Sequence, residues 1–179
     1  MQLIVAGIDP GAKGAIAFVN ENMSAVTIFD WKEVESDPKP IYDLLTSVTS
    51  LVTIESVHPQ RYLDKQTNQW KPEGGISSFS LGRNLGAWEM LLKLAKVPYI
   101  VVTPQRWQRG VKGKPGVLDK FSDKGDIKQQ VWEFAKRRWP KSELSGPRGG
   151  RLDGRSDALC LALYALREAQ GIPVTENDL

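Results

Sequence analysis

The chain has 179 residues, of which 41% are hydrophobic and 25% are charged, and its formal net charge is +3. This size and composition are typical of one soluble globular domain, expected to span residues 1–179, and exclude a disordered chain. No apolar run reaches the roughly 18 residues of a membrane span and no basic region precedes the apolar start, so we expect no membrane segment and no signal peptide.

The first part of the chain predicts four strands and one helix. Apolar, β-branched runs of strand length cover residues 3–8, 15–19, 23–29 and 51–54. The second and third runs flank a polar turn, which is typical of a hairpin. Asp37-Pro38 introduces a helix of about ten residues before the fourth strand. That strand ends at Glu55.

Residues 58–75, which follow Glu55, are mostly polar with a few aromatic residues. We expect them to form a long loop, and loops of this length are often functional. The next helix is expected to begin at Ser77 or Ser78. Its inward face is expected to comprise Phe79, Leu85, Trp88, Leu92 and Ala95. Gly82 and Gly86 lie four apart on this helix and would allow close approach by either the sheet or a second subunit.

The last third of the chain predicts a strand at 97–102, a mobile Gly- and Lys-rich loop at 109–125, and a flexible linker at 145–150. Asp126 is expected to cap a helix that ends at about Arg138. The inward face of that helix is expected to comprise Ile127, Val131, Phe134 and Ala135. An apolar helix from Ser156 to about Ala169 is the last predicted element. The elements together indicate a mixed α/β layer with antiparallel strands first.

The lone cysteine, Cys160, lies within the apolar final helix and cannot form an internal disulfide. Burial explains it better than reactivity does, and a reducing, cytoplasmic setting fits this usage.

The charge is divided unevenly along the chain. Residues 103–151 carry 13 Lys or Arg against 5 Asp or Glu, whereas the remainder carries 11 bases against 16 acids. A basic part beside an acidic part suits a polyanionic substrate such as DNA. The alternative is a basic surface that merely faces solvent.

Four acidic residues occupy positions from which they could meet. Asp9 and Glu55 each close an apolar run, so both emerge at one edge of the sheet if their strands are parallel neighbours. Asp153 and Asp157 share a helix face if the last helix begins by Asp153; if it begins at Ser156, Asp153 is a capping or loop residue. Buried acids that converge repel one another unless cations neutralise them, which favours a metal site.

Oxygen ligands suit Mg²⁺ or Mn²⁺, and the composition excludes a Cys/His zinc site. Two such ions roughly 4 Å apart would activate a water for in-line attack on a phosphodiester and stabilise the leaving oxygen. Each acid also has a structural alternative: Asp9 can shape a turn, Glu55 can be an edge acid, and Asp153 and Asp157 can be cap and surface residues. The apolar context that Asp9, Glu55 and Asp157 share favours the metal site.

A family resemblance joins these features. Four motifs follow one another along nearly the whole chain. They are GIDPGAKGAIAFV, VTIES, TPQRW (followed by a basic stretch and DIKQQV) and DGRSDALCLALYA. Together they resemble the RuvC family of Holliday junction resolvases, most closely the RuvC-like enzymes of bacteriophages. The resemblance implies a ribonuclease H-like fold, with a mixed five-stranded sheet flanked by helices. It also implies a homodimer that uses Mg²⁺ to nick opposed strands of a four-way DNA junction.

The same resemblance assigns site residues. It implies that Asp9, Glu55 and Asp157 are metal ligands and that Lys128 lies near the scissile phosphate, the alternative being a surface lysine. In bacterial RuvC the remaining acid or histidine lies where this chain has Gly154. Asp153 is expected to replace it as the fourth ligand and catalytic acid.

A second departure concerns the aromatic wedge of the bacterial enzymes, whose position corresponds to His58. Tyr62 or Trp70, in the same segment, would stack on unpaired bases or simply pack. Phosphate contacts are expected from basic residues near the site. These are Lys13, Arg106, Arg109, Lys112, Lys114, Lys120, Lys124, Arg151 and Arg155.

Three other functions are compatible with parts of this pattern. A ribonuclease H-like nuclease that cuts flaps, forks or RNA–DNA hybrids would use the same acids. An actin-like nucleotide-binding protein would need a second, similar domain. A non-catalytic DNA-binding module is disfavoured, because four carboxylates repel a phosphate backbone unless metal is bound.

Overall fold

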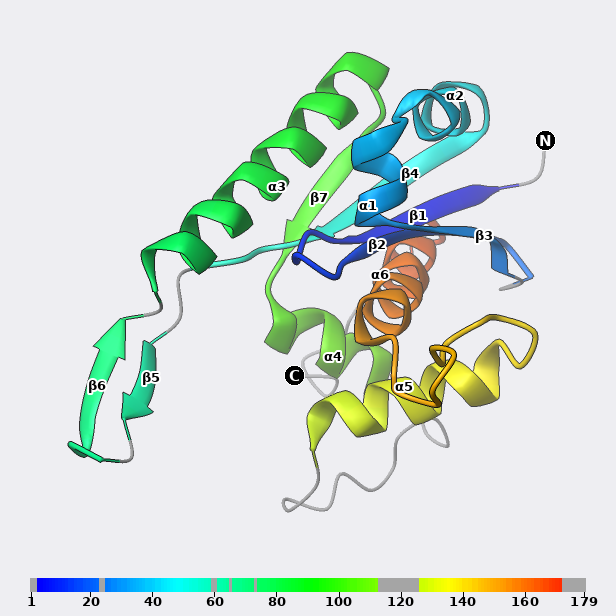
Figure 1. Ribbon diagram of the computed structural model, residues 1–179. Coiled ribbons are helices and arrows are strands. Elements are labelled where there is room, and N and C mark those ends of the chain that lie inside the picture. Colours follow the sequence, from blue (N-terminus) through cyan, green and yellow to red (C-terminus); the bar gives the residue numbers. More distant parts are fainter. Residues whose placement is uncertain are drawn as a thin grey trace.

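The computed structural model describes residues 3–22, 25–58, 61–64, 66–72, 74–112 and 126–171. At its centre lies a five-stranded sheet with the strand order β3-β2-β1-β4-β7 (Figure 1). Its strands are β1 (Ile4–Asp9), β2 (Ala15–Asn20), β3 (Ala25–Asp30), β4 (Thr49–Glu55) and β7 (Tyr99–Val102). The first three strands pair antiparallel, whereas β4 is parallel to both β1 and β7. The predicted mixed five-stranded sheet is confirmed.

Helices cover both faces of this sheet (Figure 1). One face packs against α1 (Trp31–Ser36), α2 (Lys39–Ser47) and α3 (Gly75–Ala95). The other packs against α6 (Asp153–Ala169), which is flanked by α4 (Pro104–Lys112) and α5 (Ile127–Arg138). Because both faces are covered, the central strands are apolar at nearly every position, and each strand divides its side chains between two cores.

Strand β1 and helix α6 touch backbone to backbone at Gly7. A Cβ on Gly7 would lie 2.1 Å from the nitrogen of Ala162 and 2.2 Å from the carbonyl oxygen of Ala158. A side chain cannot fit at that distance, so this contact requires glycine. The contact holds Asp9, two residues after Gly7, near Asp157, the residue before Ala158.

The segment after β4 differs from the predicted loop. It forms a two-stranded hairpin of β5 (Arg61–Asp64) and β6 (Gln69–Pro72), which projects away from the central sheet (Figure 1). A salt bridge between Lys71 and Asp64 ties its strands together. Leu63 pairs with Trp70 across the hairpin, and Asp64 pairs with Gln69. Helix α1 was also not predicted, because its six residues are too few to show a helical period.

Helix α3 begins at Gly75, earlier than the predicted serines. Trp88 and Leu92 are buried as expected, but Phe79 is 74% exposed because the first turns of α3 extend beyond the sheet. Nothing lies within 4 Å of a Cβ placed at Gly82 or Gly86, so neither glycine marks an approach to the sheet within the described structure.

Three predictions in the last third need correction. Residues 109–112 belong to α4 rather than to a loop, and residues 113–125 lie outside the described residues. Segment 145–150 is an ordered turn rather than a flexible linker, because the Gly146 amide donates to the Gly150 carbonyl at 2.8 Å and a bridge joins Ser145 to Arg151. Ile127 is 42% exposed instead of inward.

Other predictions in this region are confirmed. The Asp126 side chain caps α5 by accepting a hydrogen bond from the Lys128 amide, and Val131, Phe134 and Ala135 are buried. Cys160 is buried and free. Within the described residues, no helix is both long and apolar enough to cross a membrane.

Candidate metal and nucleic-acid site

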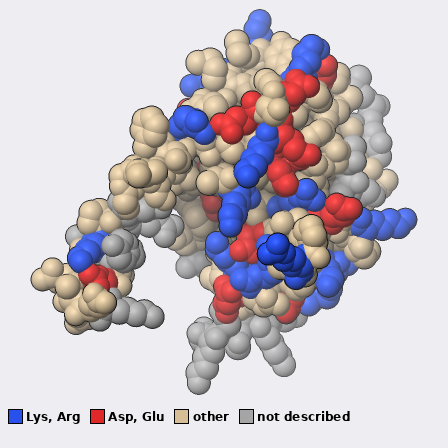
Figure 2. All heavy atoms as spheres, in the orientation of Figure 1, with Lys and Arg blue, Asp and Glu red and all other residues tan. Residues whose placement is uncertain are grey.

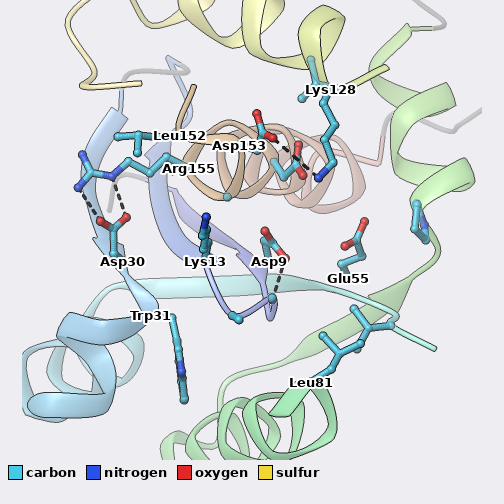
Figure 3. Close-up of a pocket in the computed structure, with 18 of the residues that line it drawn as sticks. Asp9, Lys13, Asp30, Trp31, Glu55, Leu81, Lys128, Leu152, Asp153 and Arg155 are labelled. Carbon is cyan, nitrogen blue, oxygen red and sulfur yellow. Dashed lines mark hydrogen bonds and ion pairs between the residues drawn. The ribbon is translucent and has the colours of Figure 1, made fainter. Parts of the chain in front are cut away.

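A cleft of about 950 Å³ opens at the ends of β1 and β4 and the start of α6 (Figure 3). Asp9, Glu55, Asp153 and Asp157 all line it. The structure thus brings together the four acids that the sequence singled out, from three segments far apart along the chain.

Asp9 and Glu55 meet because their strands are parallel neighbours. Ile8 pairs with Ile54 in the register of β1 and β4, so the residue after each lies at the same sheet edge. Both side chains point into the cleft (Figure 3). The Asp9 Oδ1 accepts a 2.9 Å hydrogen bond from the Gly11 amide, which fixes the carboxylate against the following turn.

Asp153 and Asp157 reach the cleft from the first turns of α6. The helix begins at Asp153, so these acids lie four apart on one face, and the alternative that Asp153 lies in a loop is excluded. Gly154 lies beneath the β1–β2 turn: a Cβ there would lie 2.1 Å from the carbonyl oxygen of Lys13. Position 154 therefore has no room for a side chain in this structure.

Burial and mutual repulsion raise the pKa of three of these carboxyl groups, those of Asp9, Glu55 and Asp157. Burial, followed by the charge of Asp9, raises the pKa of Glu55 to about 7. Burial also raises the pKa of Asp9, and it raises the pKa of Asp157 well above its ordinary value with help from the charges of Asp9, Glu55 and Asp153. The ammonium of Lys128 acts in the opposite direction on all three. Clustered groups of this kind are typical of functional sites.

Trp107 is a site residue that sequence reasoning missed. Its side chain is buried in the core beside α6, and its Nε1 donates a 2.8 Å hydrogen bond to Oε1 of Glu55. This bond orients the carboxylate and lowers the pKa of Glu55 against the effect of burial. The signal in the sequence was a tryptophan within the polar, basic TPQRWQR segment.

Lys128 enters the cleft from the first turn of α5, facing the acids (Figure 3). Its Nζ lies 3.8 Å from Oδ2 of Asp153. The side chain remains largely exposed, so its ammonium is accessible to an anion in the cleft.

The donors fit a hard divalent cation. Among the described residues, no three Asp, Glu, His or Cys side chains are close enough to share one ion as they stand. The four acids nevertheless supply oxygen donors to one cleft, and their mutual repulsion is what a bound cation relieves. Mg²⁺ and Mn²⁺ keep several waters and need few protein ligands, so this cleft suits them better than it suits zinc.

Some of the basic side chains predicted to contact phosphate are free to face the cleft, whereas others are bound to acidic residues of the protein. Lys13 is exposed and lines the cleft. Arg155 instead forms a two-point ion pair with Asp30, at 2.7 and 2.9 Å, which fastens α6 to the end of β3. Arg151 lines the cleft but pairs with both Asp126 and Asp153. His58 lines the cleft and shares a 3.0 Å hydrogen bond with the Ser56 hydroxyl.

The remaining predicted DNA contacts lie away from the cleft or cannot be placed. Arg106 is exposed but does not line the cleft, and its charge acts on the Tyr164 hydroxyl. Trp70 is 61% exposed on the projecting hairpin. The other expected contacts have side chains outside the described residues: Tyr62, Arg109, Lys112, Lys114, Lys120 and Lys124.

Comparison with known proteins supports the fold. No family model matches the sequence, and no curated protein resembles it significantly. The structure is similar to that of Thermus thermophilus RuvC, with 17% sequence identity over 94% of this chain and 97% of that chain and a TM-score of 0.57. It is equally similar to T. thermophilus RuvC in complex with a Holliday junction substrate, with 16% identity, the same coverage and a TM-score of 0.57. The predicted ribonuclease H-like fold of RuvC is thus confirmed.

Proposed function

We propose that this chain is a Mg²⁺-dependent endonuclease that resolves four-way and related branched DNA junctions by paired nicks, in the manner of the RuvC-like enzymes of bacteriophages. The observation that carries the proposal is the convergence of four carboxylates and Lys128 in one cleft. The fold shared with T. thermophilus RuvC supports it.

In this proposal the acids hold the metal, with Asp9, Glu55 and Asp157 as ligands and Asp153 as the fourth. Two bound Mg²⁺ ions, for which Mn²⁺ would substitute, would supply a water activated for attack and charge stabilisation at the leaving oxygen. Trp107 holds Glu55 in orientation through its indole N–H. Lys128 supplies a positive charge to the phosphate, because its exposed ammonium faces the acids across the cleft.

Charge and shape favour a branched DNA substrate. Basic residues concentrate between 103 and 151, and charged side chains of both signs gather over the centre of the face in Figure 2. The exposed indole of Trp70, on a hairpin that follows Glu55 closely in the chain, is suited to stack on bases unpaired at a branch point. Cutting both opposed strands requires two active sites, which is why we propose a homodimer of single-domain subunits acting in the cytoplasm.

The test compares cleavage of a synthetic four-way junction, a fork, a linear duplex and an RNA–DNA hybrid in Mg²⁺. Wild type is run beside Asp9→Asn and beside Asp43→Asn, a matched change at an exposed acid on α2. We expect symmetric nicks across the junction with wild type and Asp43→Asn, and none with Asp9→Asn. Stronger cleavage of forks or hybrids would reassign the substrate, and cleavage that persists in Asp9→Asn would overturn the site.

A further inference from the structure

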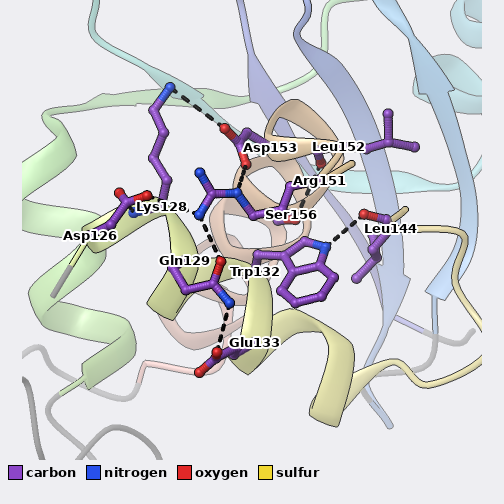
Figure 4. A network of polar contacts seen from close by, with 10 residues as sticks. All are labelled: Asp126, Lys128, Gln129, Trp132, Glu133, Leu144, Arg151, Leu152, Asp153 and Ser156. Atoms are coloured by element: carbon purple, nitrogen blue, oxygen red, sulfur yellow. Dashed lines mark hydrogen bonds and ion pairs between the residues drawn. The ribbon is translucent and has the colours of Figure 1, made fainter. Parts of the chain in front are cut away.

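Arg151 is held by three neighbours at the rim of the cleft (Figure 4). Its Nη1 lies 2.9 Å from Oδ2 of Asp126 and donates a 2.8 Å hydrogen bond to Oε1 of Gln129. Its Nε lies 3.4 Å from Oδ1 of Asp153, which is an ion pair and not a hydrogen bond. One guanidinium therefore connects the N-terminus of α5 to the N-terminus of α6.

The backbone on which Arg151 stands is also fixed. A bridge pairs it with Ser145, and the next amide, that of Leu152, donates to the Leu144 carbonyl at 3.0 Å. The same carbonyl accepts a 2.7 Å hydrogen bond from Nε1 of Trp132, in the middle of α5 (Figure 4). The side chain thus projects from an ordered turn that is itself bonded to α5.

Asp126 contacts both Arg151 and Lys128, and these two residues face the Asp153 carboxylate. Asp126 caps α5 by accepting from the Lys128 amide at 3.0 Å through Oδ1, and it holds Arg151 through Oδ2. Lys128 in turn lies 3.8 Å from Oδ2 of Asp153, whereas Arg151 faces Oδ1. Each oxygen of Asp153 therefore faces a different cation. Asp126 links the two residues that carry these cations, because it binds the guanidinium of Arg151 and the backbone amide of Lys128.

We infer that Arg151 is a positioning residue, which fixes the Asp153 carboxylate and the Lys128-bearing turn of α5 at a set spacing across the cleft. This inference rests on the proposed function for its catalytic consequence, but not for its structural one. The role requires the planar fork of a guanidinium, because a lysine ammonium is a point charge and cannot hold Asp126, Gln129 and Asp153 together in a fixed geometry. Arg151 thus serves the site through other residues rather than by neutralising a phosphate itself.

The first measurement uses the metal-free protein and no substrate. Amide hydrogen exchange is followed at Lys128 and Gln130, whose N–H groups bond to the Asp126 side chain and carbonyl. We expect Arg151→Met to speed exchange at both amides several-fold, because the cap loses its anchor. Arg148→Met, a matched loss of charge at an exposed residue of the same turn, is expected to leave them unchanged.

The second measurement separates kcat from KM on the four-way junction. We expect Arg151→Met to lower kcat about tenfold while KM changes little. Replacing a residue that orients a metal ligand typically lowers activity by about tenfold or more. Arg151→Lys keeps the charge and is expected to recover neither kcat nor the slow amide exchange. It also serves as the folded variant if Arg151→Met does not fold.

Two results would overturn the inference: unchanged exchange in Arg151→Met, or a raised KM with normal kcat that Arg151→Lys restores, which would make Arg151 a phosphate contact. If wild type cuts no branched DNA, the proposed function fails. The exchange measurement still decides whether Arg151 anchors α5, so the two failures are distinguishable.

Discussion

The indole of Trp107 donates a 2.8 Å hydrogen bond to the carboxylate of Glu55, a residue that lies 52 positions earlier in the chain. Because the tryptophan is buried and its helix packs against α6, this bond holds Glu55 at a fixed angle to the other acids. It also stabilises the charged form of a carboxyl group whose pKa burial raises to about 7.

Replacing Trp107 by phenylalanine is expected to shift the acid limb of the pH–activity profile upward. The variant loses a hydrogen bond that favours the carboxylate, so the pKa of Glu55 rises further and protons compete better with metal. A bond worth about 1.5 kcal/mol corresponds to about one pH unit. Nicking rates between pH 6 and 9 measure the shift. Trp139→Phe, in the same apolar cluster, controls for lost packing, and equal profiles in both variants would contradict the role of the bond.

The metal-free protein is expected to lose stability as the pH rises from about 4.5 to about 7. Glu55 has its pKa raised in the folded state, so the folded protein holds a proton that the unfolded chain has released, and folding is disfavoured across this window. The loss from Glu55 alone is at most about 3 kcal/mol. Denaturant unfolding with chelator at pH 5 and pH 8 measures it.

The control for that experiment is Glu55→Gln, in which the loss between the two pH values should shrink. Added Mg²⁺ should restore stability to wild type at pH 8, because the metal binds the deprotonated acids. Stability that rises from pH 5 to pH 8 without metal would contradict the burial of these acids.

Gly154→Ala is expected to destabilise the fold and abolish nicking. The new Cβ would lie 2.1 Å from the Lys13 carbonyl oxygen, so the first turn of α6 and its two acids must move. Overpacking typically costs about 1–3 kcal/mol, and more where the obstacle is backbone. Gly82→Ala is the matched control: nothing lies within 4 Å of its Cβ, and alanine should stabilise this exposed helix position by up to about 1 kcal/mol. Similar thermal melts for both variants would contradict the close contact.

DNA affinity is expected to depend on salt and on Lys13. Titrations of a labelled four-way junction, with Ca²⁺ in place of Mg²⁺, should show affinity falling steeply with salt. Lys13→Ala should reduce the slope of log affinity against log salt by about one, because one phosphate contact is lost. Arg155→Met should leave the slope unchanged, since that guanidinium is held by Asp30. Equal slopes for wild type and Lys13→Ala would remove Lys13 from the interface.

Trp70→Ala is expected to weaken junction binding about tenfold or more while keeping the salt slope, because base stacking is worth about 1–3 kcal/mol and involves no counterion. A linear duplex offers no unpaired bases, so its affinity should change less. The same titrations measure both. Equal losses on junction and duplex would place Trp70 outside the branch point.

The sequence by itself determined the strands of the central sheet, most helices and the four acids that line the cleft. Apolar runs such as that before Asp9 are local patterns, and an acid that ends a buried strand is confined to the sheet edge whatever surrounds it. The hairpin after Glu55 differs from the predicted loop, because its strands have only four residues each and the first of them shows no alternation of apolar and polar side chains.

Only the tertiary structure decided which basic side chains are available and which are engaged. Arg155 looked like a phosphate contact, yet its partner Asp30 lies 125 positions away, and no local pattern reports a pairing at that separation. The same holds for Gly7 and Gly154, whose importance depends on how closely another backbone approaches. Such contacts depend on three-dimensional packing between distant segments. The place of Asp9 and Glu55 at strand ends follows from local sequence, but their meeting required the parallel pairing of β1 and β4.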